Sequence, residues 1–417
     1  MKSLILFTGS YPYSSAAEYT FLPQEINVLS NKFKTITIVP CNIAGTLEPI
    51  KIKNVNVNID YSKFISSKSS RKKYLLSTLF DIWFLFEIYR NLSLFVKSPI
   101  CFKNAFYYRL LSKMTSDWLK SYFSNNIKHN SSKFIFQTWW FDYTTLGLSE
   151  YKNKNQNILI ITRAHGSDLY EERSPNSYIP FRKLAIRKVD GIFSASQAGA
   201  EYLFKKYPKA KNKIFTGLLG VEDPLFLNSP SIDGKFRVVS CSSLIPLKRI
   251  DLLINGLQTF CKNYKNVKII WTHIGSGPEF NYLKKIANIS RTDNFTYFFK
   301  GNLSKDQIYD YYKYEPVDLF VNVSSTEGTP VSIMEAISFG IPILATNVGG
   351  NKEIVKTKNG IIINSNPSPD ELCIEIYKLV NNPDILNNFR AGSRQVWQEE
   401  YNAKSNYEKF SKIVFNI

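Results

Sequence analysis

Short apolar runs alternate along most of the chain with longer segments whose apolar residues recur every third or fourth position. The short runs predict buried strands, and the longer segments predict amphipathic helices. Their alternation predicts an α/β protein with parallel sheets, in which a helix connects each strand to the next. The predicted strands of the first half cover residues 4–8, 35–40, 134–137, 158–162 and 191–195.

A second series of runs begins after residues 217–235, a stretch rich in Gly, Pro, Asn and Ser that is typical of a linker. The sequence therefore predicts two doubly wound domains, 1–216 and 217–396, and a C-terminal helix over about 397–417 that packs back on the first domain. Ligands of such sheets bind outside the carboxyl ends of the strands, so functional residues are expected in the loops that follow strands. The predicted strands of the second series cover residues 236–241, 267–273, 295–299, 319–323, 342–345 and 360–363.

Composition and charge narrow the class of protein. Of the 417 residues, 44 % are hydrophobic and 15 % aromatic, which excludes a disordered chain. The five cysteines form no CxxC pair and the three histidines have no metal-ligand spacing, so neither a disulfide framework nor a histidine-built metal site is expected. The net charge is +19, and residues 61–133 carry 13 basic and three acidic side chains. Such a region attracts nucleic acid, acidic lipid or a phosphorylated small molecule.

Residues 74–95 are a strongly apolar segment within that basic region. Their Leu, Ile and Phe residues contribute about −4 to −7 kcal/mol on a membrane-insertion scale, but Asp81, Glu87 and Arg90 together cost roughly 8 kcal/mol. The segment therefore predicts a helix that either packs in the first domain or lies on an acidic membrane, and not one that spans it. The N-terminal apolar run is too short for a secretory signal, so none is expected.

Residues 324–355, SSTEGTPVSIMEAISFGIPILATNVGGNKEIV, carry the most specific pattern. A strand leads into a loop with Glu327, and a helix is predicted to begin with Thr329 as its N-cap and Pro330 in the first position. The N–H groups and the positive dipole end of that helix form an anion site. Glu327 and Glu335 flank it, and carboxylates accept hydrogen bonds from hydroxyls. A ribose and a hexose joined by a diphosphate would satisfy both, which is the pattern of a nucleotide-sugar site.

Two further loops carry candidate residues. In residues 240–254, SCSSLIPLKRIDLLI, Lys248 and Arg249 lie between a strand and a helix, where two cations suit a diphosphate. His165 follows another strand in a Gly-containing loop, which places it at the ligand edge of the first sheet, and Arg163 and Asp168 flank it. No DxD triad occurs, so no divalent metal is expected on the diphosphate.

Segment 324–355 resembles the E-x7-E region of the retaining glycosyltransferases of family 4, also called glycosyl transferases group 1, in its EG-x-P, MEA, FG-x-P and GG-x-x-E elements. The resemblance covers most of the chain and is strongest over 236–355. It implies the GT-B fold, two Rossmann-like domains facing across a cleft, and a retaining, metal-independent transfer of a hexose from a UDP- or GDP-linked sugar. By resemblance, Glu335 binds the ribose hydroxyls, Glu327 contacts the donor sugar, and His165 faces the donor from the first domain; His165 and Glu327 are the predicted catalytic residues.

The resemblance also extends the set of predicted site residues. Lys248 matches the family's lysine, Ser243 stands where the family often has Arg, and Arg249 is a candidate for that missing guanidinium. The acceptor candidates are Glu18, Arg163 and Asp168. The predicted donor-binding residues are Gly9, Ser243, Lys248, Arg249, Gly277, Leu303, Gly328, Thr329, Pro330, Val331 and Glu335.

The acceptor that the resemblance implies is a saccharide, linked to a polyprenyl diphosphate, in the assembly of a bacterial O-antigen, capsule or exopolysaccharide. The basic, aromatic-rich region 61–133 favours docking on an anionic membrane, with the protein cytoplasmic and peripheral on the inner face of the cell membrane. No cofactor is expected, and no nucleic-acid partner, because no motif that reads nucleic acid stands out. Two alternatives stay open: another GT-B enzyme, such as a nucleotide-sugar epimerase or a phosphorylase, and a non-enzymatic basic protein that binds nucleic acid or membrane.

Overall fold

The computed structural model describes residues 2–126, 134–152, 158–289 and 292–416, and the chain divides into two compact units. Unit 1 comprises Met1–Leu219 and Lys404–Ile417, and unit 2 comprises Gly220–Ala403. Both divisions fall a few residues later than the sequence predicts. The observed positions have a local cause, because Val221 exchanges backbone hydrogen bonds with Tyr401 and Ala403 and so ties the two ends of unit 2 together.

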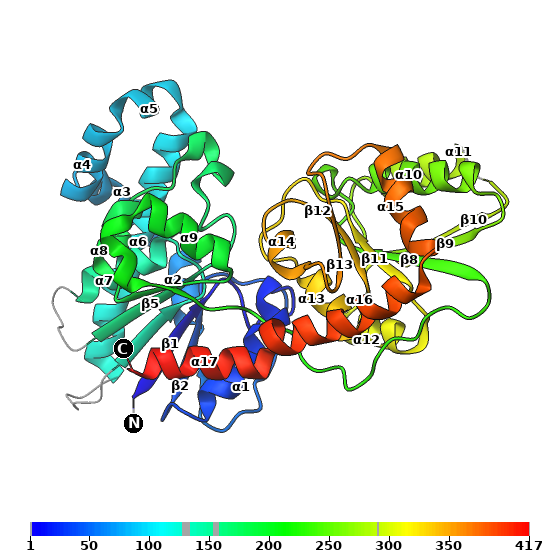
Figure 1. Ribbon diagram of the computed structural model, residues 1–417. Coiled ribbons are helices and arrows are strands. Elements are labelled where there is room, and N and C mark those ends of the chain that lie inside the picture. Colours follow the sequence, from blue (N-terminus) through cyan, green and yellow to red (C-terminus); the bar gives the residue numbers. More distant parts are fainter. Residues whose placement is uncertain (1, 127–133, 153–157, 290–291, 417) are drawn as a thin grey trace. The chain divides into compact units, whose positions relative to one another are not determined.

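Unit 1 contains a seven-stranded parallel sheet in the order β3-β2-β1-β4-β5-β6-β7 (Figure 1). The strand order reverses between β1 and β4, which makes that position the switch point of the sheet. The sequence pattern missed the edge strands β3 and β7 because each has only three residues. The strands are β1 (Ser3–Thr8), β2 (Ile36–Pro40), β3 (Val55–Val57), β4 (Phe134–Thr138), β5 (Ile158–Ala164), β6 (Gly191–Ser194) and β7 (Ile214–Thr216).

Helices cover both faces of this sheet, and the C-terminal helix α17 (Ala403–Asn416) lies against unit 1 (Figure 1). The Phe410 ring of α17 is 4.9 Å from the Phe193 ring, and the Asn406 side chain donates to the carbonyl of Leu219 at 2.9 Å. The other longer helices of unit 1 include α1 (Leu22–Ser30), α2 (Asp60–Ser66), α6 (Pro99–Asn126), α7 (Tyr143–Lys152), α8 (Arg182–Lys188) and α9 (Gln197–Lys206).

The apolar segment 74–95 forms parts of three helices, α3 (Lys68–Leu79), α4 (Ile82–Arg90) and α5 (Leu92–Lys97), so the prediction of a single helix there is wrong. The break falls at Asp81, whose carboxylate accepts hydrogen bonds from the N–H groups of Trp83 and Phe84 at 3.1 Å and so caps a new helix. None of the helices in the described part of the chain is both long and apolar enough to cross a membrane.

Unit 2 contains a six-stranded parallel sheet in the order β10-β9-β8-β11-β12-β13, with its switch point between β8 and β11. Each unit is therefore doubly wound, as the sequence predicts. The strands are β8 (Lys235–Cys241), β9 (Lys268–Ile274), β10 (Phe295–Phe299), β11 (Leu319–Asn322), β12 (Ile343–Thr346) and β13 (Gly360–Ile363). The helices are α10 (Ile250–Asn263), α11 (Phe280–Ile289), α12 (Lys305–Tyr314), α13 (Val331–Ser338), α14 (Asn351–Ile354), α15 (Pro369–Val380) and α16 (Pro383–Val396).

Candidate functional site

The loops that follow β8 and β11 meet at the switch point of unit 2. The Lys248 ammonium donates to Oε1 of Glu327 at 2.5 Å. The Ser324 hydroxyl and the Asn322 side-chain amide donate to the same oxygen at 2.6 and 3.2 Å. Glu327 is buried, so Lys248 compensates a charge that has little access to water. These bonds hold the first predicted carboxylate in one orientation at the ligand edge of the sheet.

The second carboxylate, Glu335, lies on α13 and is 6 % exposed. Burial raises its pKa to about 7, although the charge of Lys305 acts in the opposite direction. No hydrogen bond from the described residues reaches this carboxylate. Burying a carboxylate in this way costs free energy unless it is hydrogen-bonded. Glu335 is therefore suited to accept hydrogen bonds from the hydroxyls of a ligand.

Helix α12 supplies two neighbours of Glu335 that the sequence analysis missed. Lys305 is the cation that acts on the pKa of Glu335, and Tyr309, one turn further along the helix, has its own pKa raised by burial and then by Glu335. The Tyr309 hydroxyl is buried without a hydrogen-bond partner in the described residues. The only signal in the sequence is the spacing of four residues, which places both side chains on one face of a helix.

Helix α13 begins one residue later than the sequence predicts. Pro330 is the N-cap, with an extended backbone (φ −74°, ψ 102°), and Val331 is the first helical residue, so the assignment of Thr329 as N-cap is wrong. The reason is close packing, since Gly350 lies against Gly328 and Pro330. No side chain in the described residues caps this helix end. The N–H groups of the first turn are thus suited to an anion.

Two glycines let neighbouring loops press against these residues. Gly349 has φ +46°, and a Cβ there would lie 1.8 Å from the carbonyl oxygen of Glu327. A Cβ on Gly277 would lie 2.4 Å from the carbonyl oxygen of Leu244, in the loop after β8. Larger residues at either position would displace the loops that carry Lys248 and Glu327.

Arg249 holds the same loops together. Burial lowers the pKa of its guanidinium. The guanidinium of Arg249 is hydrogen-bonded to neighbouring loops, which gives Arg249 a structural position that the sequence did not indicate. Lys248 is then the cation beside Glu327. Of the other predicted donor residues, Ser243 is exposed in this loop and Leu303 packs partly buried on the core. The guanidinium donates to the carbonyls of Val323, Ser324 and Ser365 at 2.7, 2.9 and 2.7 Å and to the Asn366 side chain at 3.1 Å.

The positive charge at this site comes from the Lys248 side chain and from backbone N–H groups at the start of α13. Within the described ranges, no three His, Cys, Asp or Glu side chains gather as the ligands of a metal ion would. Lys248 and the first turn of α13 are the groups placed to face an anion at the switch point.

Unit 1 has its own group of functional candidates, on the loops after β4 and β5. His165 lies between the rings of Trp139 and Trp140, with centroid distances of 4.9 and 4.8 Å. Asp168 accepts the backbone N–H of His165 at 2.9 Å, and its Oδ2 is 3.5 Å from Nδ1 of the ring. Burial opposes ionisation of Asp168, but its interactions with His165 outweigh this and keep its pKa below the ordinary value. Asp168 therefore helps to orient His165, and neither nitrogen of the ring has a hydrogen-bond partner in the described residues.

Glu18 is buried beside these residues. Its Oε1 accepts the backbone N–H of Gly9 at 2.6 Å and the indole N–H of Trp140 at 2.9 Å. A side chain on Gly9 would meet the same oxygen, since a Cβ there would lie 2.3 Å from it. Glu18 thus braces the loop after β1 against Trp140.

Arg163 lies in the core of unit 1. It is fully buried, its Nη2 pairs with the equally buried Glu25 at 2.7 Å, and its Nη1 donates to the carbonyl of Gly217 at 2.8 Å. The guanidinium lies 4.0 Å over the ring of Phe410 on α17. The sequence-based assignment of Arg163 to the acceptor is therefore wrong, because the side chain joins α17 to the sheet and cannot reach a bound molecule.

A cavity of about 430 Å³ opens next to His165, lined by residues of unit 1 alone. Nε and Nη1 of Arg182 are buried there without a hydrogen-bond partner in the described residues. This cavity was not predictable from local patterns, because its lining comes from separate segments of the chain. Flat aromatic faces with a few polar groups suit a ligand that is itself part apolar and part polar, as sugar rings are. The lining includes Tyr107, Tyr108, Trp140, Phe141, Asp168, Tyr178 and Arg182.

Unit 2 matches a known protein family over most of its length. Residues 224–396 match the model of the family described as glycosyl transferases group 1. Unit 2 belongs to the glycosyl transferases group 1. An uncharacterized glycosyltransferase of Haemophilus influenzae is 29 % identical to this chain over 181 residues, which are 42 % of this chain and 48 % of that protein. The chain spans about half the length of the first curated relatives that it matches.

Solved structures extend the likeness to the whole chain. The apo lipopolysaccharide outer core galactosyltransferase WaaB aligns with a TM-score of 0.67 at 15 % identity, over 99 % of both chains. Anabaena HepE in complex with UDP and glucose aligns with a TM-score of 0.63 at 14 % identity, over 100 % of both chains. At these identities the likeness shows the fold. The fold of the chain is GT-B, as the sequence predicts, with one Rossmann-like domain in each unit.

Proposed function

We propose that the chain is a glycosyltransferase that moves a hexose from a nucleotide-diphosphate sugar to a saccharide acceptor. The observation that carries the proposal is Glu335, a buried carboxylate that no described residue hydrogen-bonds, on the helix whose N-terminus is suited to an anion. Two adjacent ribose hydroxyls would donate to Glu335, as the family resemblance implies. The structure of Anabaena HepE, which shares the fold, contains UDP and glucose and supports this choice of donor.

The remaining groups of unit 2 fit the other parts of such a donor. The first turn of α13 and Lys248 would receive the diphosphate, whose charge grows as the bond to the sugar breaks. Glu327 would accept a hydroxyl of the sugar, held by its bonds to Lys248 and Ser324. Because these donors already supply positive charge, we infer that the transfer needs no metal ion.

We propose retention of the anomeric configuration, as in the family that the chain resembles. The acceptor oxygen would form its bond to the anomeric carbon on the face from which the diphosphate oxygen leaves, through an oxocarbenium-like transition state. The acceptor proton would pass to the departing phosphate oxygen. His165, whose two ring nitrogens are buried without a hydrogen-bond partner in the described residues, would receive a hydrogen bond from a reacting hydroxyl.

For the acceptor we propose a saccharide linked to a polyprenyl diphosphate, in bacterial surface polysaccharide assembly on the inner face of the cell membrane. The aromatic cavity beside Asp168 supports a saccharide, since sugar rings pack on aromatic faces. WaaB, which shares the fold, is a lipopolysaccharide galactosyltransferase, and this supports the pathway.

Calorimetry with UDP, GDP and ADP, with and without their sugars and in EDTA, tests the donor. We expect one nucleotide family to bind in EDTA and Glu335→Gln to weaken it about 30-fold, because two charge-assisted hydrogen bonds are lost. Asp310→Asn, an exposed change on α12 that removes the same charge, is the matched control and should bind like the wild type. Failure of the folded protein to bind any nucleotide would contradict the proposal.

A second assay separates a transferase from an epimerase. The preferred donor is incubated without acceptor and then with lipid-linked or soluble saccharides, and products are followed by mass spectrometry and NMR. We expect a new glycosidic bond, with the donor's anomeric configuration, only when acceptor is present. Interconversion of the donor sugar without acceptor would identify an epimerase instead.

A further inference from the structure

Large apolar side chains are exposed densely on one part of unit 1. Of the 29 that are exposed in the described residues, 14 lie between Leu75 and Tyr107. Phe80 and Ile82 are 80 and 74 % exposed, on either side of the turn between α3 and α4. A dense group of exposed apolar side chains of this kind marks a binding face. We call it the α3–α5 surface, made of Leu76, Leu79, Phe80, Ile82, Leu85, Phe86, Tyr89, Leu92 and Val96.

Helix α4 has apolar side chains on the side where a surface helix normally carries polar ones. Its inner side holds Phe84, which is fully buried, and Glu87, which accepts hydrogen bonds from the hydroxyl of Tyr178 at 2.7 Å and the N–H of Phe181 at 3.2 Å. Its outer side is made of Ile82, Leu85, Phe86 and Tyr89, all exposed. A helix between a core and water shows the opposite arrangement. The outer side of α4 is thus built for an apolar environment.

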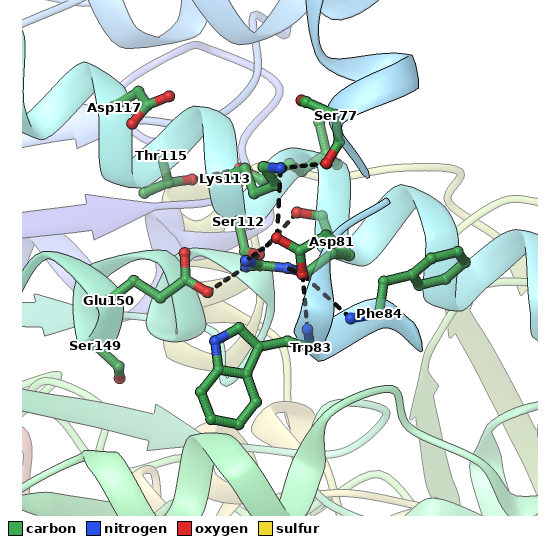
Figure 2. Close-up of polar contacts among 12 residues, drawn as sticks. Ser77, Asp81, Trp83, Phe84, Ser112, Lys113, Thr115, Asp117, Ser149 and Glu150 are labelled. Carbon is green, nitrogen blue, oxygen red and sulfur yellow. Dashed lines mark hydrogen bonds and ion pairs between the residues drawn. The ribbon is translucent and has the colours of Figure 1, made fainter. Parts of the chain in front are cut away.

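A polar anchor fixes the turn between α3 and α4 (Figure 2). Nε and Nη2 of Arg109, on α6, donate to the two oxygens of Asp81 at 2.6 and 2.8 Å, and Lys113 lies 3.4 Å from the same carboxylate. Arg109 is itself buried and also pairs with Glu150 on α7. Because Asp81 points inward, its neighbours Phe80 and Ile82 are held outward on a turn that cannot easily refold to hide them.

The charges around this surface are mostly positive. Between residues 61 and 117 the acidic side chains are Asp81, Glu87 and Asp117; the first two are turned toward the protein, and Asp117 pairs with Lys120 at 2.5 Å. The basic side chains of the same stretch are mostly exposed and surround the apolar ones. The exposed cations are Lys63, Lys68, Lys72, Lys73, Arg90, Lys97 and Lys103.

The positive charge continues beyond α4 into a cavity of about 640 Å³. Arg90 lines it together with Lys183, Arg187, Lys209 and Lys213, and no acidic side chain is among its lining residues. A further lysine there, Lys206, pairs with Glu171 at 2.7 Å. Several unneutralised cations beside an apolar face match the layered chemistry of an anionic bilayer, in which phosphate groups lie over acyl chains.

We propose that the α3–α5 surface binds an anionic lipid bilayer, with Phe80 and Ile82 inserted among the acyl chains and the surrounding cations against the phosphate groups. The charge pattern favours a membrane as the partner of this surface. A protein partner would need an equally acidic face with an apolar centre, whereas any anionic membrane offers negative charge and an apolar interior. This inference concerns a region that contributes nothing to the donor site, and it does not depend on the reaction proposed above.

Vesicle co-sedimentation with the full chain tests the proposal. We expect the wild type to bind vesicles of phosphatidylcholine with phosphatidylglycerol at least tenfold more tightly than pure phosphatidylcholine vesicles. F80S/I82S should lower the partition coefficient on anionic vesicles at least tenfold. The matched control is L225S/I232S, which changes two exposed apolar residues of unit 2 and should bind like the wild type.

The charge contribution is tested in the same assay. K72E/K73E should weaken binding to anionic vesicles several-fold, whereas K262E/K265E, which reverses two exposed lysines of unit 2, should not. Quenching of tryptophan fluorescence by brominated lipids reports insertion, and Trp83→Phe should reduce it because Trp83 lies at the same turn and is partly exposed. Nucleotide affinity and circular dichroism of each variant should match the wild type.

Three results would overturn the proposal. The first is a wild type that stays in the supernatant with anionic vesicles, and the second is an F80S/I82S variant that binds them as the wild type does. The third is a dimer in sedimentation velocity that F80S/I82S dissociates while vesicle binding is absent, which would make this surface an interface between two copies of the chain.

Discussion

The two sheets have the same strand order around their switch points but place different chemistry there. In unit 2 the loops after β8 and β11 bring together Lys248, Glu327 and, one turn into α13, Glu335. In unit 1 the corresponding edge holds an aromatic group around His165. The strand order therefore determines where a site lies. The loop residues determine whether that site binds charged groups or flat apolar faces.

The buried charges of the two units differ in the same way. Arg163 and Glu25 in unit 1 neutralise each other as an ion pair, and Gln137 adds a hydrogen bond to Glu25 at 2.7 Å. Glu335 in unit 2 has no such partner in the described residues. A buried charge with partners stabilises the fold, whereas one without partners costs stability and points to a ligand.

The largest expected effect is the loss of the paired charge. Arg163→Met leaves the buried Glu25 carboxylate without its ion-pair partner, so the free energy of unfolding should fall by about 3 to 5 kcal/mol. Urea denaturation followed by circular dichroism measures it. Lys378→Met, which removes an exposed partner of Glu375, should change stability by less than about 1 kcal/mol. A loss of that small size in Arg163→Met would contradict the structural role.

Glu335→Gln should raise the free energy of unfolding, whereas Arg163→Met lowers it. The pKa of Glu335 is about 7 in the folded chain against 4.5 for an ordinary Glu, so the folded state favours the protonated form and ionisation destabilises the fold as pH rises through this range. The variant should be more stable than the wild type by about 3 kcal/mol at pH 8, and by less than about 1 kcal/mol at pH 5. Urea denaturation without ligand at both pH values measures this. An equal effect at both would show that the carboxylate does not titrate there.

His165 tests whether the chemistry of unit 1 is separate from donor binding. His165→Asn should lower the rate of sugar transfer about 100-fold, because the imidazole that is proposed to receive a hydrogen bond from a reacting hydroxyl is removed. The affinity for the nucleotide should stay the same, since the proposed nucleotide contacts lie in unit 2. Kinetics of transfer and calorimetry on the same preparation distinguish the two effects. A parallel loss of nucleotide affinity would remove the distinction between the two units.

The smallest expected effect is the pH dependence of donor binding. Ribose hydroxyls donate to ionised Glu335, so affinity should fall about tenfold from pH 8 to pH 6 as the carboxylate becomes protonated. The ligand should be a nucleotide-diphosphate sugar, because the terminal phosphate of a free nucleoside diphosphate titrates in the same range. Calorimetry across this range measures the dependence, and Glu335→Gln should abolish it. A pH dependence that survives in the variant would assign it to another group.

Much of the fold was predictable because parallel strands and their crossover helices follow from local apolar periodicity. The strands of unit 2 match the expected runs closely, and both domains are doubly wound as expected. The two edge strands of three residues carry too little pattern to detect. The helix break at Asp81 was missed because a capping carboxylate looks, in sequence, like a charge within an apolar helix.

The functional site, like the fold, was predictable only in part. Spacing along the chain was enough to single out Glu327 and Glu335, since both lie in one strand–loop–helix segment. It could not reveal that Arg249 braces two loops, that Arg163 is buried against α17, or that Lys305 on α12 acts on Glu335. These roles depend on contacts between segments far apart in sequence.

The sequence by itself determined the two doubly wound domains, the family resemblance and the two carboxylates, because each is written in local periodicity or in a short motif. Only the tertiary structure decided which charges are satisfied and which remain available, and which apolar side chains face outward. The physical reason is that burial and hydrogen bonding are properties of the surroundings. Asp81 and Glu335 are both acidic residues beside apolar ones, yet Arg109 neutralises the first while no hydrogen bond from the described residues reaches the second.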